Sequence, residues 1–339
     1  QRPFSRPPGS PHRLLCYRAD LLERLGVEPP AEWAAYTALA EQLAAMKPEQ
    51  AAAWQGVCEP AAAGWAGQML LARAAPYVKN RKQYSTLFDY RSMEPLIAGP
   101  PFVRALEEWV AALPAASPDD LDRDPAQAWQ LLLEGRTGMA ITWPQAPLGE
   151  VPPELVGKIR CARLPGSAET YNHGEGEWEP REAGESPRVP LVGVAGRFAS
   201  VTASASDPQA ARHALTWLTG PELSGQIYPS SRYTFPFRAS HAAGAARGWG
   251  GALGPAAQKE LIEAVKEANR PTAWVFSPRL PGRAEYLAAL DEAVRRALRG
   301  EAEPEAALAE AAEAWRAITE RLGVEAQRTA CSRRLGLEP

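Results

Sequence analysis

The sequence contains few of the residues that build metal, redox and catalytic centres. It has four histidines and four cysteines in 339 residues. No His-Glu-x-x-His, Cys-x-x-Cys, Gly-x-Ser-x-Gly or Walker A pattern occurs, so we expect no metal and no cofactor. The even cysteine count leaves both a disulfide and buried free thiols open. The cysteines are Cys16, Cys58, Cys161 and Cys331, and the histidines are His12, His173, His213 and His241.

The sequence also lacks a basic excess and long apolar runs. Lys and Arg total 37 against 40 Asp and Glu, which gives a net charge of -3. Proteins that grip phosphate backbones usually carry a basic excess, so we expect no nucleic-acid partner. No apolar run reaches the roughly 20 residues that a membrane-spanning helix needs. With 45% hydrophobic and 23% charged residues, the composition excludes a mainly disordered chain.

Strand and helix patterns alternate along the chain, which predicts an α/β fold of about two domains. Strands are expected at 14–17, 138–143, 158–164 and 191–195. Helices are expected at 20–25, 33–43, 65–77, 100–113, 125–132, 208–218, 256–268, 284–298 and 305–322. Asp20 is expected to cap the first helix. In the helix at 208–218, the side chains expected to face inward are Ala211, Ala214, Leu215 and Leu218. Residues 171–190 are rich in Gly, Glu and Pro and predict a mobile surface loop.

Eleven tryptophans are scattered along the chain, and two of them lie beside predicted strand ends or small residues. Trp143 ends the predicted strand GMAITW, and ligands of open α/β sheets collect at the carboxyl ends of strands. Trp65 follows a run of small residues that leaves its ring open. Such a ring stacks on the apolar face of a sugar while a carboxylate takes its hydroxyls. Core packing is the competing interpretation for each ring.

Paired carboxylates would be needed for a glycosidase. Glu59, Asp89 and Glu94 are candidates, but the sequence does not pair them. A carbohydrate-processing hydrolase that uses Glu59 or Asp89 therefore stays as an alternative, and a helical interaction protein with no small ligand is a third.

Several stretches, taken in order, resemble the extracellular solute-binding proteins of bacterial ABC transporters, family 1, sugar type. The best match is LLCYRADLLERLGVEPPAEWAAYTALAEQL at 14–43. AWQLLLEGRTGMAITWPQAP resembles the family's helix–glycine–strand element, and VPLVGVAG its returning hinge strand. SDPQAARHALTWLTGPE and the closing LPGRAEYLAALDEAVRRALRGEAEPEAALAEAAEAW resemble later helices of the family.

The resemblance implies a periplasmic-binding-protein-like class II fold, with two lobes joined by hinge strands. Lobe two would comprise 11–190 and 254–330, and 191–253 would be the returning part of lobe one. The hinge would pass near His12, Leu191–Val194 and Gly248–Gly254. Most of the first lobe is expected to be missing, because the family's N-terminal segment is absent before Tyr17. No signal peptide is seen, and the chain opens with Gln1, which favours a fragment or a processed form.

The resemblance also implies a function and a set of ligand-binding residues. The protein would be the non-catalytic solute-binding component of an ABC importer, a monomer that captures a sugar between its lobes and delivers it to permease subunits. It would be extracytoplasmic, either periplasmic or a membrane-anchored lipoprotein. The implied ligand-binding residues are Glu59, Trp65, Trp143, Gln145, Arg232, Tyr233 and Tyr286.

Overall fold

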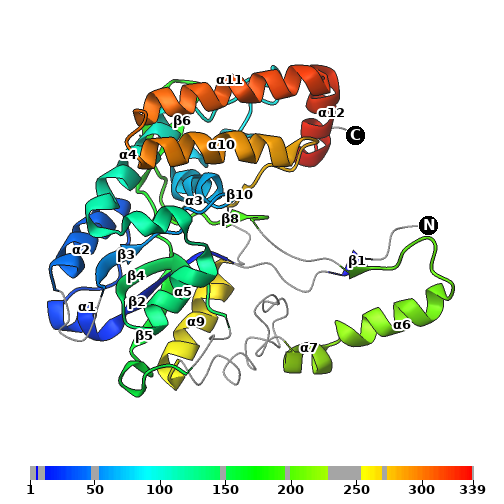
Figure 1. The fold of residues 1–339 in the computed structure, drawn as a ribbon. Coiled ribbons are helices and arrows are strands. Elements are labelled where there is room, and N and C mark those ends of the chain that lie inside the picture. The colour runs from blue at the N-terminus through cyan, green and yellow to red at the C-terminus, as the bar shows by residue number, and fades with distance from the viewer. Residues whose placement is uncertain are drawn as a thin grey trace.

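A four-stranded mixed sheet forms the centre of the molecule (Figure 1). The computed structural model describes residues 5–6, 12–46, 53–145, 150–194, 199–227, 253–268 and 273–337. The strand order is β3-β4-β2-β5, and β3 and β4 pair in parallel while β2 runs antiparallel to both β4 and β5. The strands are β2 (Leu14–Arg18), β3 (Gln55–Cys58), β4 (Thr137–Thr142) and β5 (Ile159–Arg163).

Helices cover both faces of this sheet, because apolar side chains alternate between the faces along each strand. In β2, Leu15 and Tyr17 belong to the larger core, whereas Leu14 and Cys16 belong to a second core on the opposite face. The larger core is built with α2 (Trp33–Met46), α3 (Ala66–Val78), α4 (Pro100–Ala112), α10 (Arg283–Leu298) and α11 (Pro304–Leu322). The second core is built with α5 (Pro125–Leu133) and α9 (Pro255–Ala268).

Most helices begin and end close to the residues that local sequence signals predict. Gly26 ends α1 (Ala19–Leu25) with a φ of 68°, a left-handed conformation that glycine adopts without strain. Asp124 caps α5 in a capping box with Gln127. The expected cap at Asp20 is wrong: α1 begins one residue earlier, and Asp20 instead forms an ion pair with Arg18 at 2.7 Å.

The described part of the chain also contains three short 3₁₀ helices and one further helix. They are η1 (Leu113–Ala115), η2 (Pro118–Asp122), η3 (Pro153–Leu155) and α12 (Val324–Leu335). β8 (Leu191–Val192) pairs in parallel with β10 (Val275–Phe276), so the expected strand at 191–195 is present but shorter. None of the helices in the described ranges is both long and apolar enough to cross a bilayer.

Two helices and a two-stranded ribbon lie to one side of the sheet and its helices (Figure 1). They are β1 (Ser5–Arg6), β9 (Ala199–Ser200), α6 (Pro208–Leu218) and α7 (Pro221–Ile227). The helix at 208–218 forms as expected, but its expected inward face is only partly correct. Leu215 is buried, whereas Ala214 and Leu218 are exposed. The division into 11–190, 191–253 and 254–330 stays a prediction.

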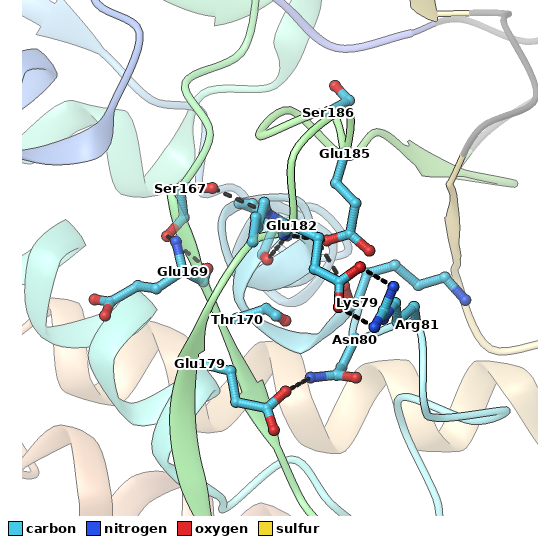
Figure 2. Close-up of polar contacts among 12 residues, drawn as sticks. Lys79, Asn80, Arg81, Ser167, Glu169, Thr170, Glu179, Glu182, Glu185 and Ser186 are labelled. Carbon is cyan, nitrogen blue, oxygen red and sulfur yellow. Dashed lines mark hydrogen bonds and ion pairs between the residues drawn. The ribbon is translucent and has the colours of Figure 1, made fainter.

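The predicted mobile loop at 171–190 is wrong, because a docked hairpin occupies much of it. β6 (Glu169–Asn172) pairs with β7 (Glu177–Pro180), and polar contacts fix the hairpin to the end of α3 (Figure 2). The Asn80 side-chain amide donates to Glu179 at 3.1 Å, and the Thr170 hydroxyl donates to the carbonyl of Tyr77 at 3.0 Å. Alternation of Tyr171 and Trp178 with polar residues was the strand signal that the Gly and Glu content obscured.

Candidate functional site

One edge of the central sheet brings together residues from distant parts of the chain. β3, β4 and β5 all end at this edge and β2 begins there, since Leu14 pairs with both Thr142 and Arg163. Arg13, which precedes β2, and Trp143, which follows β4, therefore lie next to each other at the edge. Ligands of α/β proteins bind outside the carboxyl ends of strands, so this edge is the candidate site.

Trp65 and Trp143 meet at this edge. Their ring centroids are 5.6 Å apart and the rings are tilted by 53°. Trp65 is half-buried, and Trp143 is 8% exposed. The guanidinium carbon of Arg13 lies 5.9 Å from the centroid of the Trp65 ring. The arrangement offers an aromatic surface bordered by a cation.

A carboxylate on a neighbouring helix holds the turn that carries Trp65. Gly64 has a φ of 87°, and Trp65 is the residue before the first turn of α3. The side chain of Asp291 in α10 accepts hydrogen bonds from the backbone N–H groups of Gly64 and Gly67, both at 3.0 Å. A β-carbon at Gly67 would lie 3.0 Å from the backbone nitrogen of Asp291, so α10 and α3 pack closely here. Asp291 thus positions Trp65.

The segment after β4 is anchored by α5. The indole N–H of Trp129 donates to the backbone carbonyl of Gln145 at 2.9 Å, and the Thr142 hydroxyl donates to the carbonyl of Pro125 at 2.5 Å. The side chain of Gln145 is 7% exposed, and its Nε2 has no hydrogen-bond partner among the described residues. Buried polar groups are normally satisfied, so this amide, two residues after Trp143, is a candidate ligand donor.

Glu59 lies in the core rather than beside the tryptophan pair. Its carboxylate accepts hydrogen bonds from Arg73 Nη1, at 2.8 and 2.9 Å, and from the Tyr36 hydroxyl at 2.9 Å. The Arg73 guanidinium carbon is also 4.0 Å from the centroid of the Trp33 ring. Burial raises the pKa of Glu59 and Arg73 opposes that shift. With 3% exposure and its oxygens bonded, Glu59 is a structural residue in this arrangement.

The other predicted site residues divide between the core and segments outside the described ranges. Tyr286 is fully buried, and its hydroxyl lies 2.8 Å from Thr319 Oγ1, so it packs in the helical core. Arg232 and Tyr233 lie outside the described residues, as do positions 248–252 of the expected hinge. Asp89, the second carboxylate of the hydrolase alternative, closes a turn by accepting from Ser92. All four cysteines are buried, and no disulfide joins them in the structure.

Arg13 and Asp291 were missed by sequence reasoning. Only a weak sequence signal pointed to Arg13, which directly precedes the first buried strand. Its position beside Trp143 follows once β2 and β4 are known to pair. Asp291 carried none, since its contact joins segments more than 200 residues apart. In the described part of the chain, no group of three His, Cys, Asp or Glu side chains gathers in a way that would hold a metal.

A family model describes the larger part of the chain. The model for bacterial extracellular solute-binding proteins matches residues 7–223, well over half of the sequence. The chain belongs to this family. The family is one of binding proteins, and its members are extracellular. No curated protein matches this solute-binding protein in sequence.

Solved structures with the same α/β, class II periplasmic-binding-protein-like fold include carbohydrate and polyol complexes. A solute-binding protein of Agrobacterium radiobacter K84, in complex with ribitol, aligns with a TM-score of 0.61 at 18% identity, over 94% of this chain and 69% of its own. Maltose-bound MalE3 of T. maritima aligns with a TM-score of 0.65 at 17% identity, over 90% of this chain and 70% of its own. A solute-binding protein of Agrobacterium vitis S4 with bound D-mannitol aligns with a TM-score of 0.61 at 17% identity, over 94% of this chain and 73% of its own.

Proposed function

We propose that this protein captures a carbohydrate or polyol for an ABC importer and releases it, chemically unchanged, to permease subunits. The observation that carries the proposal is the pair of tryptophan rings at the carboxyl edge of the sheet, 5.6 Å apart. Support comes from the family and from neighbours of the same fold whose ligands are ribitol, maltose and D-mannitol. The protein acts as an extracytoplasmic monomer.

The solute would be recognised by aromatic stacking and by hydrogen bonds. The rings of Trp65 and Trp143 supply an apolar face for the C–H groups of a sugar. The unsatisfied Nε2 of Gln145 supplies a donor for a hydroxyl. Arg232 and Tyr233 would add contacts from the segment 191–253, which closes over the solute about the strand at Leu191–Val192. Solute binding then shifts the population toward the closed form by its greater affinity for that form.

The experiment is equilibrium dialysis of the protein against maltose, D-mannitol and ribitol, with the solute recovered and analysed by NMR. The proposal predicts saturable, one-to-one retention of at least one of them and recovery of the intact molecule. A cleaved or isomerised product would favour the hydrolase alternative instead. Loss of such turnover in a folded Asp89→Asn variant would then implicate that carboxylate.

A further inference from the structure

The guanidinium of Arg13 is buried, and no carboxylate in the described part of the chain pairs with it. The residue is 7% exposed, and its three side-chain nitrogens have no hydrogen-bond partner among the described residues. Its one described contact of polar character is the ring of Trp65. Burial lowers the pKa of Arg13 to about 9, so the group is still a cation at neutral pH. Buried charges in proteins are normally paired, because an unpaired one loses its hydration with nothing in return.

Arg13 lines a pocket together with two further arginines. Arg163 and Arg188 face the same pocket, whose apolar wall includes Ala72 and Leu191. Arg163 donates to the backbone carbonyl of Arg188 at 2.7 Å. Burial lowers the pKa of Arg163, and the nearby Arg188 charge lowers it further. The fold therefore holds three cations around one small space, although like charges repel.

Carboxylates do not balance these cations. Glu267 is 4.0 Å from Arg163, and within the described ranges no carboxylate lies within ion-pair distance of Arg13. Outside the described residues, the only Asp or Glu positions in the sequence are Glu49 and Glu338. Among the described residues, Arg13 and Arg188 therefore have no carboxylate partner, and the three side-chain nitrogens of Arg13 have no acceptor. Guanidinium groups present paired donors that match the geometry of carboxylate and phosphate oxygens.

We propose that the pocket of Arg13, Arg163 and Arg188 is an oxyanion site, which takes a carboxylate or phosphate group. The group has two possible sources. Because Arg13 also contacts the ring of Trp65, the anionic group can be part of an acidic sugar that stacks on that ring. In that case this inference rests on the proposed function. The alternative source is a free inorganic anion bound beside the solute site.

Thermal unfolding in the presence of defined probes separates these sources. The probes are sodium phosphate, sodium D-glucuronate and, as the neutral counterpart, D-glucose, all at constant ionic strength. A ligand near 100 times its Kd raises Tm by about 4 °C in a protein of this size. A rise with glucuronate alone indicates an acidic solute, and a rise with both anions a free oxyanion site. No rise with either anion, or an equal rise with glucose and glucuronate, overturns the proposal.

Variants test whether Arg13 acts through the anion or through packing. Arg13→Met should lose the anion-induced rise and, without anion, should melt at or above the wild-type temperature, because it removes an unpaired buried charge. Arg188→Met, at a half-buried position, should reduce the rise, and the exposed Arg24→Met should keep it. An anion-induced rise retained in both pocket variants would overturn the proposal. Failure of neutral sugars to bind in dialysis would instead count against the proposed function and leave the phosphate result standing.

Discussion

Glu59 and Arg73 form an ion pair that is almost completely removed from solvent. The exposures of the two side chains are 3% and 0%. Removing one partner of a buried pair leaves the other charged, desolvated and unpaired, which is far more costly than the pair itself. The contacts of Tyr36 and Trp33 complete the enclosure of this pair. The pair is therefore expected to stabilise the fold.

We predict that Glu59→Gln lowers the free energy of unfolding by about 3–5 kcal/mol, because Arg73 loses its counter-charge in the core. Urea unfolding measures the change. The control is Glu134→Gln, which breaks a half-exposed ion pair with Arg136 and should cost less than about 1 kcal/mol. A loss for Glu59→Gln no greater than that of the control would show that the pair is not buried in solution.

Asp291 is the residue on which the position of Trp65 depends. Asp291→Ala leaves the N–H groups of Gly64 and Gly67 without their acceptor and should destabilise the protein by about 1–3 kcal/mol. It should also weaken solute binding, although Asp291 does not reach the ring pair itself. Glu292→Ala, at an exposed position on the same helix, is the matched control. Unchanged solute affinity in Asp291→Ala, measured by calorimetry on folded protein, would contradict the positioning role.

At the scale of elements, the hairpin of β6 and β7 is held to the end of α3 by Glu179. Lys82, Asn172 and Asn80 donate hydrogen bonds to its carboxylate, which lowers its pKa to about 2 from an ordinary value of 4.5. The folded state thus binds fewer protons at this group than the unfolded state. The stabilisation is complete above pH 4.5 and is lost as the pH falls through about 2.

We therefore expect the unfolding free energy of the wild type to fall more steeply below pH 4.5 than that of Glu179→Gln. Unfolding in urea at several pH values provides the measurement. Glu175→Gln, at the exposed tip of the hairpin, should keep the wild-type slope. Parallel curves for wild type and Glu179→Gln would show that the hairpin contacts do not form in solution.

The sequence predicted the helices better than the hairpin, because the contacts that decide helix ends lie closer together in the sequence. Capping at Asp124 and termination at Gly26 are decided by neighbours a few residues away, so local patterns were sufficient. The hairpin depends on contacts between segments about 100 residues apart, such as Asn80 with Glu179. Its Gly-rich tip resembled a loop because the stabilising partners were elsewhere in the sequence.

The candidate site divides in the same way. Trp65 and Trp143 were predicted from strand ends and small neighbours, and the structure brings the two rings together. Glu59 also follows a strand, but Arg73 in α3 and Tyr36 in α2 donate hydrogen bonds to its carboxylate. Arg13 became visible only through strand pairing. The position of a residue in the sequence predicts that it lies at the edge of the sheet. Whether its side chain can contact a ligand there depends on partners from other helices and strands.

For the whole molecule, the central claim is that a solute binds at the ring pair and leaves unchanged. Calorimetric titration with a solute retained in dialysis, compared between wild type and Trp65→Ala, tests it most directly. Loss of one stacking face should weaken binding by about tenfold or more. The control, Trp217→Ala, removes a 68% exposed ring on α6 and should bind as the wild type does. Equal affinity of wild type and Trp65→Ala would contradict the account.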